Sequence, residues 1–179
     1  LLEAGCKVQL LYSQASQVVA KQEMDIELPS RPSEARAALL ARFPTANEAN
    51  LAVFGREEWF APVASGSNPP DAMVVCPCSM GTLAAIAQGL ADNLIERAAD
   101  VVMKEGRKLV LVPRETPFSA IHLENMLRLS RAGAVILPPS PGFYHHPQSV
   151  KDIVDFVVAR VMDQIGVPHT LMQRWGEDR

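Results

Sequence analysis

Four segments of the chain carry polar side chains directly after a run of apolar residues. They are 13–16 (Ser-Gln-Ala-Ser), 77–82 (Pro-Cys-Ser-Met-Gly-Thr), 113–117 (Pro-Arg-Glu-Thr-Pro) and 138–146 (Pro-Pro-Ser-Pro-Gly-Phe-Tyr-His-His). If the apolar runs are parallel strands, these segments follow the carboxyl ends of the strands, where open parallel sheets bind their ligands. We therefore expect the ligand site to be built from these four segments.

The second segment has the composition of an anion-binding turn. Ser79, Gly81 and Thr82 stand at the start of a helical periodicity. The free backbone amides and the dipole of a helix N-terminus favour a phosphate group. The alternative is that Ser79 only caps the helix and Gly81 only relieves packing, and the sequence supports the two interpretations about equally.

The third segment places two opposite charges side by side. Arg114 and Glu115 directly follow a buried apolar run, so one interpretation is that they face a ligand beyond the sheet. The other is that they form a salt bridge, or that Glu115 caps the next helix. The residue types alone leave both interpretations open.

Neither the histidines nor the cysteines predict a metal site. His145 and His146 are adjacent, so their side chains point apart on an extended chain, and no third ligand stands at a suitable spacing. Cys76 and Cys78 lack a second pair of ligands. We expect no bound metal.

An alternation of strands and helices must position these segments. Strands are predicted at 7–12, 72–76, 108–112 and 134–137, and helices at 13–21, 33–42, 79–99, 118–131 and 149–165. Continuous apolar strands that alternate with helices indicate an α/β fold, an open parallel sheet with helices on both faces, of the Rossmann or flavodoxin type. Residues 1–5 have the pattern of a helix end, so we expect the first strand of such a fold to be absent from the sequence.

The composition is that of one globular domain, expected over residues 1–179 with a C-terminal tail from about 168. A net charge of −3, from 17 basic and 20 acidic residues, does not favour binding to nucleic acid or to an acidic membrane, and small molecules are the expected partners. Three cysteines make a poor disulfide framework, and no apolar run reaches the about 20 residues of a membrane span. These features predict a cytoplasmic protein.

Several motifs together resemble those of the flavin prenyltransferases of the UbiX type, a branch of the homo-oligomeric flavin-containing decarboxylase fold. They are 76–84 (Cys-Pro-Cys-Ser-Met-Gly-Thr-Leu-Ala), 93–101 (Asn-Leu-Ile-Glu-Arg-Ala-Ala-Asp-Val), 111–117 (Leu-Val-Pro-Arg-Glu-Thr-Pro) and 141–144 (Pro-Gly-Phe-Tyr). The resemblance runs in register from residue 1 to about residue 174. Members of this family begin with a strand and a Gly-Ala-Ser-Gly-type loop that contacts the flavin, and this sequence contains neither.

The resemblance implies a metal-independent transfer of the dimethylallyl group from dimethylallyl phosphate to N5 and then C6 of reduced FMN. The prenylated FMN would be the cofactor of UbiD-type reversible decarboxylases, one of which acts in ubiquinone biosynthesis. The resemblance also implies a homo-oligomer, in this family a dodecamer. Apolar residues around the helix predicted at 149–165 agree with a subunit interface.

The resemblance assigns roles to individual positions. Those that match flavin-binding residues are Ser13, Ser79, Met80, Gly81, Thr82 and Arg114. Those that match the prenyl phosphate site are Lys104, Tyr144 and Arg160, with Arg97 and Glu115 nearby. Glu23 matches a carboxylate that a neighbouring subunit contributes to the site. Trp59 and Trp175 match the aromatic residues around the prenyl chain.

These residue types suit the implied chemistry. Departure of phosphate from an allylic carbon leaves a cation and builds negative charge on the leaving group, which cationic donors stabilise without a metal. Indole rings can stabilise an allylic cation and exclude water. Glu115 could relay a proton to or from the phosphate during ring closure.

Two other functions are compatible with the same fold. A flavin-dependent peptidyl-cysteine or phosphopantothenoylcysteine decarboxylase would usually carry a histidine base and an asparagine-containing substrate motif, which we do not find. A non-catalytic flavin-binding subunit is the other alternative. The cluster of Lys104, Tyr144 and Arg160 favours a phosphate co-substrate.

Overall fold

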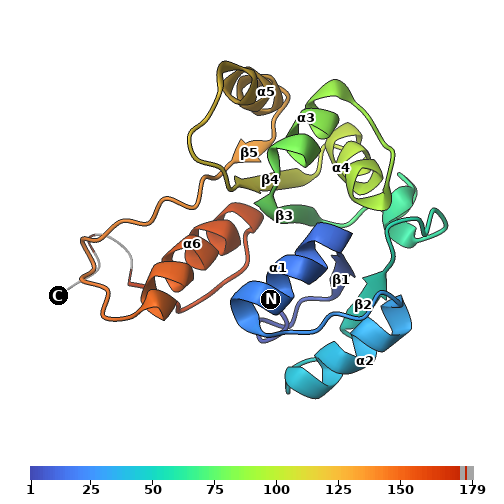
Figure 1. Cartoon of the computed structure of the whole chain (residues 1–179), viewed down its shortest axis with the longest axis horizontal. Coiled ribbons are helices and arrows are strands. Elements are labelled where there is room, and N and C mark those ends of the chain that lie inside the picture. The colour runs from blue at the N-terminus through green and yellow to red at the C-terminus, as the bar shows by residue number, and fades with distance from the viewer. Residues whose placement is uncertain (174–175, 177–179) are drawn as a thin grey trace.

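A computed structural model describes residues 1–173 and 176 and confirms an α/β fold (Figure 1). Its strands are β1 (Val8–Leu11), β2 (Leu51–Phe54), β3 (Ala72–Cys78), β4 (Lys108–Pro113) and β5 (Val135–Ile136). Its helices are α1 (Gln14–Met24), α2 (Pro32–Arg42), α3 (Met80–Gln88), α4 (Leu94–Lys104), α5 (Ala120–Arg131) and α6 (Val150–Ile165), with a short 3₁₀ turn at Pro62–Ala64. None of the described helices is long and apolar enough to cross a membrane.

The strands pair in parallel, as predicted, but in two groups. β1 pairs with β2, and β3, β4 and β5 form a three-stranded sheet in that order. Leu11 of β1 and Met73 of β3 pack against the same small apolar cluster around Val63 and Leu94. Side-chain packing therefore connects the two groups of strands.

The core of the larger sheet is β4. Leu109, Val110, Leu111 and Val112 are each at most 1% exposed. In Figure 1, α6 lies on the opposite side of β4 from α3 and α4. Both faces of this strand are covered, which explains why its sequence is a continuous apolar run without alternation.

The segment predicted as one helix over 79–99 forms two helices, and this prediction was wrong. Gly89 ends α3 in the left-handed region, with φ +72°. Asn93 then caps α4, because its side-chain oxygen accepts hydrogen bonds from the amides of Ile95 and Glu96 at 3.0 and 3.1 Å. The break lets α4 run back toward the start of β4, which fixes where Arg97 and Lys104 lie.

Strand β2 was not predicted. Its four residues are too short a run to stand out beside the weakly patterned segment before it, and it forms through its pairing with β1. The helix predicted over 33–42 is confirmed as α2. At the start of the chain, the Gly5 and Cys6 amides donate to the carbonyls of Leu2 and Leu1, the hydrogen-bond pattern of a helix end with Gly5 at φ +76°.

Shortening Leu111 tests the importance of β4. Leu111→Ala should lower the free energy of unfolding by about 2–5 kcal/mol, because it opens a cavity under both helix layers. Leu127→Ala is the matched control, since Leu127 is 50% exposed, and it should cost about 1 kcal/mol or less. Urea unfolding at fixed protein concentration measures both, and equal losses would contradict this account of the core.

Candidate functional site

The carboxyl ends of β3 and β4 bring two of the four polar segments together. Cys78 is the register partner of Pro113, and the Arg114 amide donates to the Cys78 carbonyl at 3.2 Å. Ser79 and Arg114 are therefore the first residues beyond the sheet on neighbouring strands. We call Arg114 and residues 79–82 the strand-end site.

The N-terminus of α3 offers unpaired amides to this site. Ser79 caps the helix, because its Oγ accepts from the Thr82 amide at 3.2 Å. The amides of Met80 and Gly81 have no acceptor among the described residues. A Cβ added at Gly81 would meet only Ser79 Oγ, at 3.9 Å, so Gly81 does not relieve packing inside the protein. Free amides beside open space fit an anionic group such as a phosphate.

Arg114 and Glu115 do not pair with each other. Glu115 Oε1 accepts from the Thr116 amide at 3.0 Å and so binds its own loop. Within the described part of the chain, the exposed Arg114 guanidinium has neither a hydrogen bond nor an ion pair. Of the alternatives left open by the sequence, a ligand-facing Arg114 agrees with this geometry.

Tyr144 packs against α6, and Arg160 belongs to this helix. The Tyr144 ring, in the segment after β5, stands edge-on to Phe156 with ring centres 6.0 Å apart. Arg160 is one helical turn further along α6 and forms an ion pair with Asp163 at 2.7 Å. The structure thus associates these two predicted phosphate ligands with one helix.

Lys104 lies at the opposite edge of the sheet from Arg114. It ends α4, and the tight turn after it leads directly into the first residue of β4, whereas Arg114 follows the last. Six strand residues separate the two edges by about 20 Å. Within one subunit, Lys104 and Arg114 cannot contact the same small ligand.

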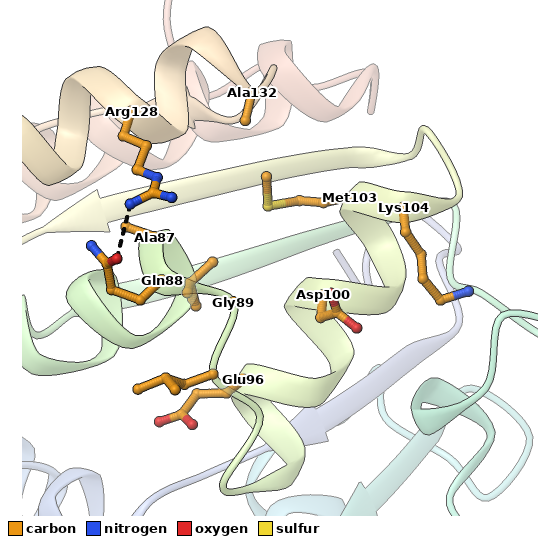
Figure 2. A pocket seen from close by; sticks show the side chains of 11 residues that line it. Ala87, Gln88, Gly89, Glu96, Asp100, Met103, Lys104, Arg128 and Ala132 are labelled. Atoms are coloured by element: carbon orange, nitrogen blue, oxygen red, sulfur yellow. Dashed lines mark hydrogen bonds between the residues drawn. The ribbon is translucent and has the colours of Figure 1, made fainter.

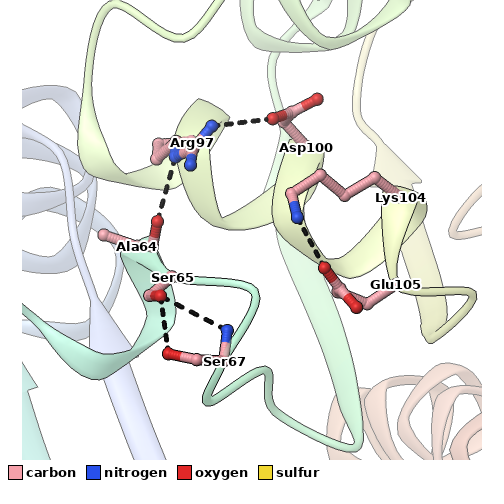
Figure 3. Close-up of polar contacts among 7 residues, drawn as sticks. All are labelled: Ala64, Ser65, Ser67, Arg97, Asp100, Lys104 and Glu105. Carbon is pink, nitrogen blue, oxygen red and sulfur yellow. Dashed lines mark hydrogen bonds and ion pairs between the residues drawn. The ribbon is translucent and has the colours of Figure 1, made fainter.

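A second polar cluster surrounds Lys104 (Figure 3). Arg97 Nε donates to the Ala64 carbonyl at 3.0 Å, and its guanidinium pairs with Asp100. Lys104 pairs with Glu105. We call Arg97, Lys104 and the 64–67 loop the α4 cluster.

The 64–67 loop approaches these cations closely. A Cβ at Gly66 would come within 2.4 Å of Lys104 Nζ and 2.2 Å of Glu105 Oε1, so a larger residue there would displace the ends of these two side chains. The hydroxyls of Ser65 and Ser67 lie 2.9 Å apart beside it. This loop is not among the ligand segments predicted from the sequence, and its Ser-Gly-Ser composition is the one sequence signal that points to it.

A cavity of about 430 Å³ lies between α3, α4 and α5 (Figure 2). Lys104 and Arg128 line it together with the carboxylates of Glu96 and Asp100. Arg128 is already bonded to Gln88 Oε1 at 2.8 Å. Because both signs of charge line this cavity, it has no marked preference for an anion.

The other predicted residues are dispersed. Ser13 caps α1, where its Oγ accepts from the Ser16 amide at 3.1 Å. Glu23 lies near the other end of α1, ten residues or about 15 Å away. Trp59 is 45% exposed in the segment after β2. Trp175 lies outside the described residues.

The described residues contain no group of three or more His, Cys, Asp or Glu side chains that could hold a metal ion. Cys78 is buried, and burial raises the pKa of its thiol to about 12. A thiol with that pKa is neither a ready metal ligand nor a ready nucleophile at neutral pH.

A parallel α/β fold with free helix amides at the strand ends is typical of proteins that bind a phosphate-bearing cofactor. The family model described as Flavoprotein matches residues 1–162. The chain is 56% identical over 177 residues to the flavin prenyltransferase UbiX of Pseudomonas aeruginosa. The aligned region covers 99% of this chain and 84% of that protein. The chain belongs to the flavin prenyltransferases of the UbiX type.

More distant relatives and solved structures agree. The flavin prenyltransferase UbiX of Methanocaldococcus jannaschii is 43% identical, over 98% of this chain and 88% of that protein. A dodecameric FMN-dependent UbiX-like decarboxylase from Escherichia coli O157:H7 has a TM-score of 0.84 at 44% identity, over 98% of this chain and 90% of that chain. AnUbiX in complex with FMN and dimethylallyl pyrophosphate has a TM-score of 0.83 at 43% identity, over 97% of this chain and 84% of that chain.

Gly81→Ala tests the strand-end site. The added methyl group enters the open space at the helix N-terminus, so FMN affinity should fall by about tenfold or more. Helix stability should be unchanged or rise by up to about 1 kcal/mol, because alanine is the better helix former. Fluorescence titration with FMN and a melting curve measure the two effects, and unchanged FMN affinity would contradict the assignment.

Proposed function

We propose that this protein transfers the dimethylallyl group from dimethylallyl phosphate to reduced FMN. The observation that carries the proposal is the strand-end site at the ends of β3 and β4, with two amides and an arginine that have no partner within residues 1–173 and 176. It occurs in a chain that belongs to the flavin prenyltransferases.

The strand-end site fits the flavin. The amides of Met80 and Gly81 and the guanidinium of Arg114 would hold an anionic part of FMN by charge-assisted hydrogen bonds. Reduced FMN, when bound, supplies N5 and C6 as the atoms that accept the prenyl group. Ser13 would approach the flavin from α1, at the end of the other group of strands.

Tyr144 and Arg160 would hold the prenyl phosphate. As the carbon–oxygen bond of the allylic phosphate breaks, the leaving phosphate takes the electron pair, and its new charge is stabilised by the guanidinium and the phenol. Trp59 and Trp175 would surround the prenyl chain, where an indole face can stabilise the allylic cation and exclude water. Glu115 would move a proton to or from the phosphate.

The α4 cluster and Glu23 would complete this site from neighbouring subunits. Lys104 lies about 20 Å from Arg114 within one subunit, too far for a shared ligand. In a closed oligomer, however, one copy can present that edge to the strand-end site of the next. Arg97, Lys104 and the hydroxyls of Ser65 and Ser67 have the chemistry to bind a phosphate.

An exposed apolar stripe supports assembly. Val150, Val154 and Val158 follow one another at every fourth position of α6 and are 78%, 52% and 40% exposed. Apolar residues on one helix face typically mark a contact with another protein surface. A dodecamer is the proposed state, and a UbiD-type decarboxylase is the proposed recipient of the prenylated FMN.

Anaerobic incubation with reduced FMN and dimethylallyl phosphate tests the proposal. The flavin mass should increase by one dimethylallyl unit, and inorganic phosphate should be released in equal amount. Unchanged flavin together with decarboxylation of a cysteine-derived substrate would identify the decarboxylase alternative. Unchanged flavin with neither reaction would identify a non-catalytic flavin-binding subunit.

Glu115→Gln tests the proton-relay role. The amide keeps the size of the side chain and an oxygen for the Thr116 amide but removes the basic carboxylate. The rate of adduct formation should fall by roughly 100-fold or more, with FMN affinity retained. Stopped-flow spectra of the reduced flavin measure the rate, and undiminished turnover would show that the carboxylate moves no proton.

Mixing two inactivated variants tests whether the site is shared between subunits. Lys104→Ala and Arg160→Ala should each abolish most activity, because each removes a phosphate ligand. Mixed oligomers assembled from equal amounts should regain about a quarter of the wild-type activity, since one site in four then receives both intact residues from different subunits. No recovery in verified mixed oligomers would mean that one subunit supplies both residues.

A further inference from the structure

The imidazole of His145 has an unusual environment. Both of its ring nitrogens are shielded from solvent and have no hydrogen-bond partner among the residues that the structure describes. Buried polar atoms without a partner are costly and uncommon. His145 directly follows Tyr144, so its ring lies beside a predicted phosphate ligand.

Three aromatic rings of the described residues meet at this point. His145 stacks on Phe156 with ring centres 5.4 Å apart and an interplanar angle of 16°. Tyr144 stands edge-on to both rings, at 5.7 Å from His145 and 6.0 Å from Phe156. Stacked and edge-to-face contacts are the favourable geometries for aromatic pairs. We call these residues the ring cluster.

The backbone at Gly142 lies close to the Tyr144 ring. A Cβ added at Gly142 would lie 2.7 Å from Tyr144 Cε1 and 3.4 Å from Phe156 Cε2. Gly142 therefore lets the segment after β5 fold directly onto the Tyr144 ring. The phenol ring is held between a glycine and two other rings.

The ring cluster also connects Tyr144 to Arg160. Phe156 and Arg160 are four residues apart on α6, so they lie on neighbouring turns of one helix face. The ring that orients Tyr144 thus belongs to the element that carries the guanidinium. Tyr144 itself is 47% exposed, so the cluster does not bury it.

We propose that His145 is a positioning residue that works through its ring face. It packs against both Phe156 and Tyr144 and fixes the phenol relative to Arg160, so that both reach the same prenyl phosphate. The imidazole nitrogens take no part in binding. This inference rests on the proposed function, because it assumes that Tyr144 and Arg160 bind that phosphate.

Three variants separate the ring face from the nitrogens. His145→Phe keeps a stacking ring without nitrogens, His145→Ala removes the ring, and Phe156→Leu removes the stacking partner but keeps apolar volume. His146→Asn is the matched control, because His146 is exposed and has φ +52°, which asparagine tolerates. Calorimetry measures the affinity of dimethylallyl phosphate for protein loaded with oxidised FMN, and steady-state kinetics measure KM and kcat with reduced FMN.

His145→Ala and Phe156→Leu should each weaken dimethylallyl phosphate binding by roughly threefold to tenfold and raise its KM, with FMN affinity unchanged. His145→Phe and His146→Asn should stay within about twofold of the wild type. Loss of affinity in His145→Phe equal to that in His145→Ala would overturn the inference and assign the effect to the nitrogens. Undiminished affinity in His145→Ala would overturn it as well. Absence of binding by the unchanged protein would overturn the proposed function, and the inference with it.

Discussion

The parallel pairing of β3 with β4 determines where the candidate ligands of this protein lie. Val74 and Val75 are in register with Val110 and Leu111, and the pairing ends where Cys78 meets Pro113. The buried residues of β4 pack between helices on both faces of the sheet, which holds this strand in the centre of its layer. The α3 amides and Arg114 follow directly from this edge and are positioned by the most deeply buried strand of the molecule.

Because the strands run in the same direction, the α4 cluster lies at the opposite end of the sheet from the strand-end site. Each helix that follows a strand must return the chain to the other edge of the sheet, and α4 ends there with Lys104. Arg97 and the Ser-Gly-Ser loop gather around it. In the proposed function, the two halves of the phosphate-transfer site would lie at opposite ends of one subunit. An assembly of several copies would then bring them together.

Much of the fold could be predicted from the sequence, because its signals are local. Continuous apolar runs identified β3 and β4, and Ser13 and Ser149 cap helices that begin at the next residue. The break at Gly89 was missed because Leu90 and Leu94 continue the helical spacing across it. Strand β2 was missed because it is short and forms only through tertiary pairing.

The candidate site was less predictable. The meeting of Ser79 and Arg114 follows from parallel topology alone, whereas the contact of Gly66 with Lys104 joins residues distant in sequence through the close packing of one loop. The stacking of His145 on Phe156 likewise joins a loop to a helix whose relative placement has no local signal. Residue types indicated the chemistry, but the three-dimensional structure was needed to show which side chains lie at the same end of one subunit.

A crystal structure of the assembled protein with FMN and dimethylallyl phosphate tests the central claim most directly. The account predicts the flavin at the strand-end site, against the Met80 and Gly81 amides and Arg114. It also predicts that the prenyl phosphate is bound by Tyr144 and Arg160 of one subunit and by Lys104 of another. A flavin bound elsewhere, or a phosphate whose ligands all come from one subunit, would contradict it.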